Sequence, residues 1–282
     1  MSEQSCSACG QVTPQAFRFH ANGCAIWQCV TCGLGRADTK DFDPAAYYTA
    51  DYFSGGRSDG YSDYRGAEPV LRREFAHSAD FVRRFSDGSR LLDLGCAYGF
   101  FLKEAAKRQF EVLGIELAED AAESCRQAGL NVLSGIADET NMTRIGEVDV
   151  ITMFDVIEHL PQPRESLALC VRYLKPGGVI VITTGDFGSL AARWAGTKWR
   201  LMTPPQHLWF FTQESLRRMA TTLGLTMEHF EHPAKIVPLS LIMFQLGRMI
   251  GLRGPQIAVA SHMGVPVNLF DAMRVVLRKG QA

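Results

Sequence analysis

The chain has 282 residues, of which 46% are hydrophobic and 21% are charged, so it can build a packed core. Its 29 lysines and arginines nearly balance its 30 aspartates and glutamates, which argues against a protein that coats nucleic acid and predicts no DNA partner. The first residues are polar, and no run of about 18 apolar residues occurs. We therefore expect a cytoplasmic protein without a signal peptide or a transmembrane helix.

Four of the eight cysteines form two Cys-x-x-Cys pairs, each followed by a glycine. They are Cys6, Cys9, Cys29 and Cys32. Two such pairs predict a structural zinc site, since four thiolates leave no coordination position open for catalysis. Cys24 and His20 lie between the pairs and are predicted to be bystanders. We expect residues 1–40 to form a zinc-ribbon-like module around a hairpin in residues 17–28, folded largely by the metal.

Residues 41–87 are predicted to connect this module to the main domain. Residues 41–66 are rich in tyrosine and glycine, and they either pack on the main domain as a linker or cover a ligand as a lid. Residues 67–86 carry apolar side chains at helical spacing and predict a helix.

The main domain, residues 88–282, alternates strands and helices. Strands are predicted at 90–94, 110–116, 130–134, 148–153, 178–184, 225–232 and 272–279, and helices at 99–108, 119–128, 163–174 and 213–222. Nearly continuous apolar strands separated by helices predict an α/β fold with a parallel sheet covered on both faces. Residues 236–268 are predicted to be a variable insertion.

A glycine-containing turn follows the first of these strands and leads into a helix. Its glycines, Gly95 and Gly99, are four residues apart, so the turn lacks the Gly-x-Gly-x-x-Gly pattern of dinucleotide folds. Asp93 precedes them, and its carboxylate would repel a phosphate but suit an ammonium or a sulfonium group. Both features argue against the alternative of a nicotinamide oxidoreductase.

Acidic residues also follow the next two strands. Glu116 ends the second strand, where a carboxylate can accept hydrogen bonds from two ribose hydroxyls. Asp138, after the third strand, can accept a hydrogen bond from an adenine amino group. A cation, a ribose and an adenine together describe S-adenosylmethionine (SAM).

These motifs, with the Glu158-His159 pair and the run 174–178, resemble those of class I SAM-dependent methyltransferases over roughly residues 88–279. The resemblance implies a Rossmann-like sheet with the N-terminal zinc module of a bacterial branch often found in surface-sugar and secondary-metabolite gene sets. Ala97 is a departure, because many members have glycine there. The cofactor-binding residues that the resemblance implies are Asp93, Gly95, Cys96, Ala97, Gly99, Glu116, Ala137, Asp138, Phe154 and Asp155.

The fourth strand runs into Glu158 and His159, and His207 follows the fifth strand. These three residues are the predicted catalytic group, with a histidine as the base for a hydroxyl acceptor. The layout also resembles small-RNA 2′-O-methyltransferases and ubiquinone-pathway O-methyltransferases, which implies a Mg²⁺ site at Asp155, Glu158, His159 and His207. The alternative is a structural Glu158-His159 pair, with His207 capping the next helix or packing on Trp209.

The predicted reaction is methyl transfer to oxygen on a sugar, or on a glycosylated or phenolic small molecule. Transfer to carbon, nitrogen or RNA stays open, as does a non-catalytic scaffold in which the zinc module docks a partner. Basic and aromatic residues between 194 and 209, among them Lys198 and Arg200, either bind the acceptor or form a covering helix. Residues 238–254 are apolar enough for a peripheral membrane contact, a dimer face or a packed helix.

Overall fold

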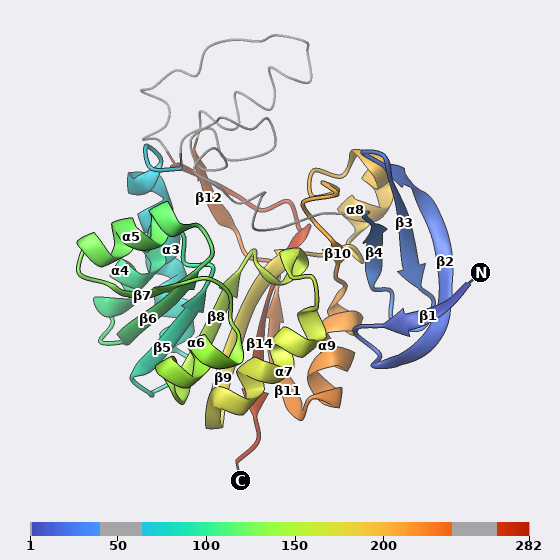
Figure 1. The fold of residues 1–282 in the computed structure, drawn as a ribbon. Coiled ribbons are helices and arrows are strands. Elements are labelled where there is room, and N and C mark those ends of the chain that lie inside the picture. Colours follow the sequence, from blue (N-terminus) through green and yellow to red (C-terminus); the bar gives the residue numbers. More distant parts are fainter. Residues whose placement is uncertain (1, 40–63, 239–263, 282) are drawn as a thin grey trace.

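The computed structural model describes residues 2–39, 64–238 and 264–281. Its centre is a seven-stranded sheet with the strand order β11-β14-β9-β8-β5-β6-β7 (Figure 1). The five strands from β9 to β7 are parallel, and β14 runs antiparallel to both of its neighbours. The strands are β5 (Arg90–Leu94), β6 (Glu111–Glu116), β7 (Asn131–Ser134), β8 (Val148–Phe154), β9 (Leu174–Gly185), β11 (Leu225–Glu231) and β14 (Ala272–Lys279).

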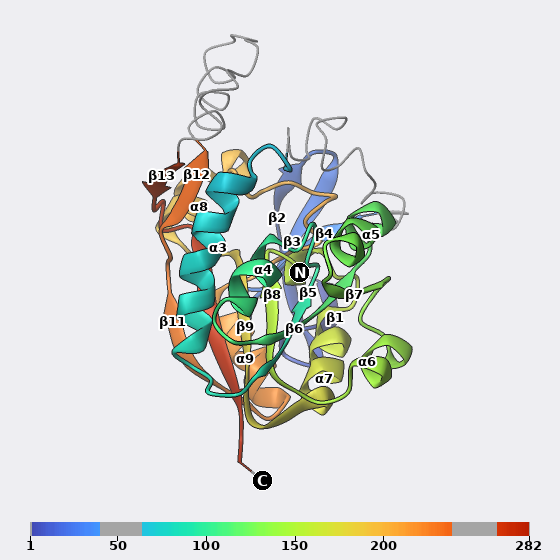
Figure 2. The same cartoon turned by 90° about the vertical axis from the view of Figure 1, so that its left-hand side faces the viewer.

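Helices cover both faces of this sheet, as the sequence predicts. One face carries α3 (Glu68–Arg83), α4 (Phe100–Ala106) and α5 (Glu119–Gln127), and Figure 2 shows α3 lying along it. The other face carries α6 (Glu139–Ile145), α7 (Pro163–Tyr173) and α9 (Gln213–Thr222). Neighbouring residues of a strand point to opposite faces. Accordingly, Leu91 of β5 lies in the hydrophobic cluster of α3, α4 and α5, and Leu92 lies in that of α6, α7 and α9.

The N-terminal residues form a second, antiparallel sheet with the order β1-β2-β3-β4-β10. Its strands are β1 (Ser2–Cys6), β2 (Gln11–Ala21), β3 (Cys24–Cys29), β4 (Gly35–Asp38) and β10 (Trp209–Phe210). The predicted hairpin is confirmed as β2 and β3, which pair from Ala21–Cys24 to Gln15–Cys29. The last strand comes from the main domain, where Trp209 pairs with Arg36 of β4. The N-terminal sheet is therefore joined to the main domain by backbone hydrogen bonds.

Short elements flank the sheet. They are the one-turn helices η1 (Ile157–His159) and η2 (Gly196–Lys198), α8 (Leu190–Ala195), and the hairpin β12 (Lys235–Pro238) and β13 (Gly264–Val267). This hairpin stands at the two ends of the predicted insertion, and its β12 packs on α3.

Two predicted segments fall mainly on residues that are not described. Of the aromatic connector 41–66, the structure places the end, where the ring of Tyr64 stacks on Phe100 with centroids 5.4 Å apart. The proposed membrane-contact segment 238–254 lies outside the described residues apart from its first residue. Within the described ranges, no helix has the length and apolar character needed to cross a membrane.

Candidate functional site

The sheet has a point where its strand order changes direction. Starting from β5, the chain continues to β6 and β7 on one side and then to β8 and β9 on the other. Ligands of open α/β sheets bind at the carboxyl ends of the strands beside such a point. Asp93 lies near this end of β5, Glu116 ends β6, and Asp155 follows β8. The predicted acidic residues thus share one edge of the sheet.

The loop between β5 and α4 needs glycine at both of its ends. Gly95 and Gly99 have φ angles of 69° and 70°, the left-handed region that side chains disfavour. A Cβ atom at Gly95 would lie 2.8 Å from Val156, and one at Gly99 would lie 2.5 Å from Leu130. The two glycines therefore let the loop fold tightly over the strand ends, with α4 starting at Phe100.

Glu116 ties this loop to the second strand. Its Oε2 accepts a hydrogen bond from Ala97 N at 2.7 Å, and its Oε1 accepts one from Ala118 N at 2.8 Å. Burial raises the pKa of this carboxyl group, although the two N–H groups act in the opposite direction. A carboxylate has about four acceptor positions, so both oxygens can still accept further hydrogen bonds from a ligand.

Ala97, the departure from the family pattern, has a φ of 46° and so adopts the left-handed conformation without being glycine. This conformation costs a non-glycine residue roughly 1–2 kcal/mol. Glycine would avoid that cost, but its greater conformational freedom in the unfolded chain would offset part of the benefit. We expect Ala97→Gly to raise the free energy of unfolding by about 0.5–1 kcal/mol in urea denaturation. The matched control is Ala76→Gly in α3, at a right-handed position, which should lower it by a similar amount. If Ala97→Gly instead lowered the free energy of unfolding, the packing of the Ala97 methyl group would contribute more stability than its left-handed backbone costs.

Asp93 is buried within β5. The hydroxyl of Thr152 on the neighbouring strand β8 donates a hydrogen bond to its Oδ1 at 2.6 Å. Burial raises the pKa of Asp93 to about 7. A cation placed beside this carboxyl group would favour its ionised form and so bind more strongly above that pH.

The other predicted cofactor residues surround this loop. Cys96 is buried, and a Cβ atom at Gly114 of β6 would lie 2.7 Å from its Sγ. Asp138, beside Ala137, caps α6, because its Oδ1 accepts a hydrogen bond from Asn141 N at 2.8 Å. The ring of Phe154 packs edge-on against Phe101 with centroids 4.7 Å apart, which places it over the α4 side of the sheet.

Asp155 stands apart from the residues with which the metal prediction grouped it. Its φ of 56° is in the left-handed region, so the backbone at Asp155 does not continue into a helical turn with Glu158 and His159. Lys235 Nζ lies 2.7 Å from its Oδ2, and the Thr183 hydroxyl donates to its Oδ1 at 3.0 Å. The Asp155 side chain is 45% exposed. Partial desolvation would raise the pKa of its carboxyl group, but Lys235 and Thr183 outweigh this effect and keep the pKa below its ordinary value.

Glu158, His159 and His207, in contrast, come together. One ligand atom from each lies within 4.8 Å of the others. The Nδ1 atoms of His159 and His207 each lie 2.8 Å from a backbone carbonyl oxygen, that of Gln206 and that of Leu201. Because a carbonyl can only accept, each Nδ1 carries the proton, and Nε2 is the nitrogen that can bind a metal or accept a proton.

Burial changes the acid–base behaviour of this cluster. It raises the pKa of Glu158 to about 8, with a further contribution from the nearby Asp155. It lowers the pKa of His207 to about 3 and that of His159 below its ordinary value. Within the described part of the chain, Glu158 Oε2 is buried and has no hydrogen-bond partner. An oxygen of this kind can accept a hydrogen bond from a ligand or a water molecule, or bind an ion.

The four predicted cysteines also come together, with one sulfur atom of each within 4.8 Å of the others. Cys6 Sγ lies 3.6 Å from Cys32 Sγ, and Cys9 Sγ lies 3.9 Å from Cys29 Sγ. The cluster lies where the N-terminal sheet meets α9, and the Thr212 hydroxyl that precedes this helix donates to Cys32 O at 3.0 Å. Cys24 and His20 lie outside the two metal-like groups found among the described residues.

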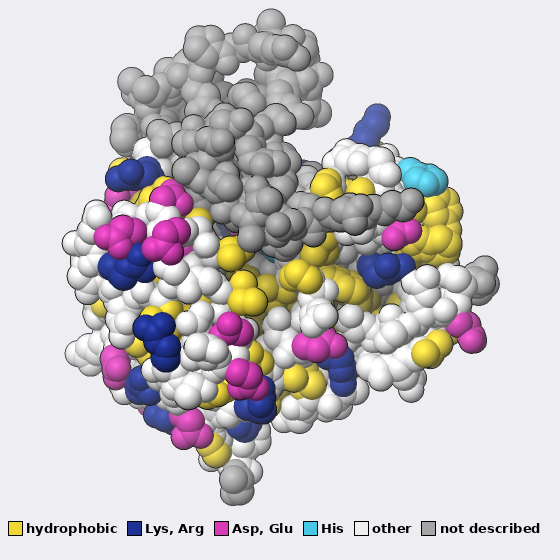
Figure 3. Space-filling view, viewed as in Figure 1, with side chains coloured by type: hydrophobic (Ala, Val, Ile, Leu, Met, Phe, Trp, Pro, Cys, Tyr) yellow, Lys and Arg dark blue, Asp and Glu magenta, His cyan; other side chains and the backbone are white. Residues whose placement is uncertain are grey.

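The basic and aromatic residues between 194 and 209 divide into two groups. Trp199 is buried, and its indole N–H donates to Asp271 at 3.0 Å, while Arg200 Nη2 lies 2.8 Å from the same carboxylate. This pairing makes them part of the framework at the carboxyl edge. Trp194 on α8 is 93% exposed. Figure 3 shows hydrophobic side chains gathered between the two sheets, below the atoms drawn in grey.

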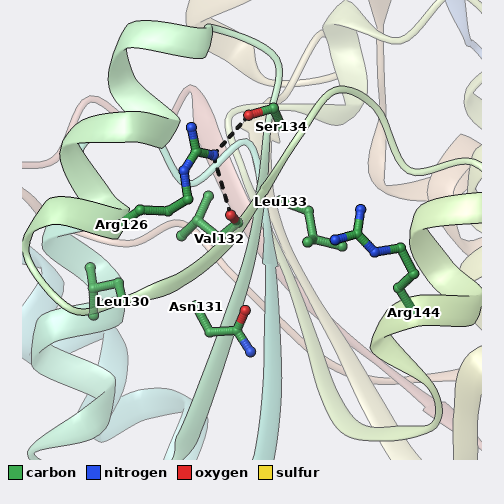
Figure 4. Close-up of a pocket in the computed structure, with 7 residues that line it drawn as sticks. All are labelled: Arg126, Leu130, Asn131, Val132, Leu133, Ser134 and Arg144. Atoms are coloured by element: carbon green, nitrogen blue, oxygen red, sulfur yellow. Dashed lines mark hydrogen bonds between the residues drawn. The ribbon is translucent and has the colours of Figure 1, made fainter.

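A separate surface pocket of about 510 Å³ lies along the outer edge strand β7. Figure 4 shows Arg126 and Arg144 on the two sides of this strand, and Arg126 Nη1 donates to Ser134 Oγ at 2.9 Å. None of the predicted site residues lines this pocket. The candidate site is therefore the carboxyl edge of the sheet around β5, β6 and β8.

Comparisons with known proteins identify the family of the chain. Residues 70–230 match the family described as "Methyltransferase domain". A ubiquinone biosynthesis O-methyltransferase of Methylococcus capsulatus is 36% identical over 107 residues, which are 34% of this chain and 44% of that protein. Its counterpart in Thiobacillus denitrificans is 30% identical over 153 residues, which are 50% of this chain and 66% of that protein. The chain thus spans less than half the length of the first of these curated relatives.

Two solved structures share the fold. The magnesium protoporphyrin IX methyltransferase of Synechocystis, solved with bound SAH, has a TM-score of 0.50 at 9% identity, covering 75% of this chain and 84% of its own. A SAM-dependent methyltransferase from Archaeoglobus fulgidus has a TM-score of 0.50 at 21% identity, covering 73% and 92%. The family match extends over more than half of the chain, and the sheet order and glycine loop agree with it. The chain therefore belongs to the class I SAM-dependent methyltransferase family.

Proposed function

We propose that this enzyme transfers the methyl group of SAM to a hydroxyl oxygen of a phenolic or sugar-containing small molecule. The observation that carries the proposal is the cluster of the buried Glu158 with the half-buried His159 and His207, at the carboxyl edge of the sheet where β8 ends. Such a polar cluster suits an acceptor that must lose a proton as it attacks the methyl group. The two ubiquinone-pathway relatives are named as O-methyltransferases and support the same reaction type.

The experiment is a transfer assay with SAM carrying a trideuterated methyl group. The purified chain is incubated with catechol, other phenols and nucleotide sugars, and the products are separated and weighed by mass spectrometry. The proposal predicts a product that is heavier by one labelled methyl group, located on oxygen by fragmentation. A label found only on carbon or nitrogen would contradict it.

The cofactor is proposed to lie across the carboxyl ends of β5 and β6. In this arrangement Glu116 accepts hydrogen bonds from the ribose, Asp93 and the loop from Gly95 to Gly99 face the methionine end, and Asp138 lies on the adenine side. Buried carboxylates attract a sulfonium or an ammonium group strongly, because folding has already removed most of the water around them. The bound cofactor supplies the electrophilic methyl group.

The raised pKa of Asp93 makes SAM affinity depend on pH. The cation of SAM favours the ionised carboxylate, whereas the free protein holds a proton there below pH 7. Affinity should therefore be full above that pH and fall about tenfold for each pH unit below it. Calorimetry between pH 5.5 and 7.5 tests this, since an α-amino group with an ordinary pKa of about 7.7–8.0 stays mostly charged over that range. Asp93→Asn should bind more weakly with a flat profile, and a flat profile in the wild type would contradict the role of Asp93.

The predicted Mg²⁺ site fits the structure poorly in its original form. With Asp155 paired to Lys235, the cluster offers two imidazole nitrogens and one carboxylate, a donor set that suits Mn²⁺ or another borderline ion better than Mg²⁺. The orphaned Glu158 Oε2 supports an ion at this place. Glu158, His159 and His207 would hold it, and a divalent ion there would lower the pKa of an acceptor hydroxyl.

Metal removal tests this ion. Dialysis against EDTA should abolish methyl transfer, and Mn²⁺ should restore it more fully than Mg²⁺. The zinc content must be measured in parallel, so that loss of the cysteine-bound metal is recognised. Full activity in EDTA with the cysteine cluster still loaded would show that no ion takes part.

A further inference from the structure

A short segment after β11 crosses the carboxyl edge of the sheet. His232 Nε2 lies 2.9 Å from Oδ2 of Asp186, the residue that follows β9. Three residues later, Lys235 Nζ reaches Asp155, the residue that follows β8. The segment 232–235 therefore lies across the ends of β9 and β8. Strand β8 is the neighbour of β5, at whose end the cofactor is proposed to bind. The ends of β9 and β8 are the half of the edge that the proposed cofactor leaves to the acceptor.

His232 and Asp186 form a dyad with the geometry of an oriented base. The Asp186 side chain is 8% exposed, and its Oδ1 accepts a hydrogen bond from Gly188 N at 2.9 Å, which fixes the carboxylate. The His232 side chain is 25% exposed, and its ring packs against Phe230 and Phe270 with centroids 5.0 and 6.2 Å away. Because the carboxylate accepts from Nε2–H, the lone pair lies on Nδ1. Within the described ranges Nδ1 has no hydrogen-bond partner, and it is not among the buried unpaired atoms.

The two histidines predicted as bases are less suited to hold a proton. His159 and His207 donate Nδ1–H to neutral carbonyl groups, so the group that orients each ring carries no charge to offset an imidazolium. Their rings lie 4.7 Å apart, and two charged imidazoles at that distance would repel. The proton acceptor needs a nearby anion and contact with solvent, and His232 has both.

We infer that His232 Nδ1 is the catalytic base that takes the proton of the acceptor hydroxyl, and that Asp186 is its positioning residue. The inference rests on the proposed transfer to oxygen. The O–H bond breaks and leaves its electron pair on the oxygen, which bonds to the methyl carbon of SAM. The C–S bond breaks toward sulfur, which gives neutral S-adenosylhomocysteine. The proton stays on His232, opposite the Asp186 carboxylate, until solvent removes it.

The kinetic experiment uses the acceptor that the wild-type enzyme methylates fastest. It is chosen from the phenols and nucleotide sugars above, beginning with catechol. His232→Gln should lower kcat by about 10²–10⁴-fold and leave the Kd for SAM unchanged within about twofold. His232→Ala should regain part of its rate when imidazole is added, because the site opens to solvent. The matched control is His77→Gln, an exposed histidine on α3, which should behave as wild type. A kcat for His232→Gln within about threefold of the wild-type value would overturn the inference.

A second measurement needs no acceptor. Long-range ¹H–¹⁵N spectra at pH 8, with the His232 signals assigned by their absence in His232→Gln, should show a proton on Nε2 and none on Nδ1. In Asp186→Asn this preference should weaken, and kcat should fall while SAM binding persists. A proton on Nδ1 in the wild type would overturn the inference. If the wild type methylates no hydroxyl in the panel, the proposed function fails, and this spectrum still decides whether His232 is built as a base.

Discussion

Replacing Glu116 by alanine should raise the Kd for SAM by about 100-fold or more and lower the free energy of unfolding by about 2–5 kcal/mol. The loss of stability follows because the backbone N–H groups of Ala97 and Ala118 would lose their buried acceptor. Each such orphaned donor costs about 1–3 kcal/mol. The loss of affinity follows because the ribose would lose its charged acceptor and the loop its anchor. Calorimetry with SAM and urea denaturation measure the two effects.

Two further variants separate these effects. Glu116→Gln keeps the size of the side chain but has one acceptor oxygen, so it should fall between the wild type and alanine in both measurements. Glu111→Gln lies at the opposite end of the same strand, where the exposed carboxylate pairs with Arg90 at 3.3 Å, and it should leave SAM binding unchanged. An alanine variant that binds SAM as tightly as the wild type would remove Glu116 from the cofactor site.

The second large effect is expected at the cysteine cluster. We propose that it holds one Zn²⁺, because four convergent sulfurs are the donor set of structural zinc sites. Cys29→Ser should lose the metal and unfold the N-terminal sheet, since structural zinc contributes roughly 10 kcal/mol or more in small domains. Elemental analysis should find one zinc per wild-type chain and none in this variant. Cys24→Ser is the matched control, because Cys24 lies in the same sheet but outside the cluster.

Unfolding of the N-terminal sheet in Cys29→Ser should also loosen the part of the main domain around β10. Ala37 N donates to Leu208 O at 2.9 Å, and Leu208 N donates to Glu158 O at 2.9 Å. Hydrogen exchange should therefore become faster at Ala37 and Leu208 in Cys29→Ser, while the central strand β5 stays protected. A wild-type protein that contains no metal and is as stable after chelation as before would contradict the zinc proposal.

The sequence predicts the main sheet because its strands are runs of buried residues separated by amphipathic helices. The strand 90–94, the helix 213–222 and the strand 272–279 are confirmed at both ends. Sequence does not reveal β10, which has two residues and owes its existence to β4, far away in the chain. The antiparallel insertion of β14 between β9 and β11 is likewise a tertiary event without a local pattern.

The candidate site follows the same division. The four cysteines and the set Glu158, His159 and His207 could be grouped by residue type and spacing, and the structure brings them together. The resemblance groups Asp155 with the latter set, but residues at i, i+3 and i+4 share a face only in a helix, and the left-handed backbone of Asp155 breaks that geometry. The sequence does not indicate the pair of His232 and Asp186, because the two residues lie 46 positions apart and neither belongs to a motif.

The most direct test of the account is a calorimetric titration of the zinc-loaded wild-type chain with SAM at pH 7.5. The account predicts one binding site per chain with micromolar affinity, displacement by S-adenosylhomocysteine and severe weakening in Glu116→Ala. No binding in the wild type, with the fold intact by circular dichroism, would contradict the assignment of the edge formed by Asp93, Gly95 and Glu116 as the cofactor site.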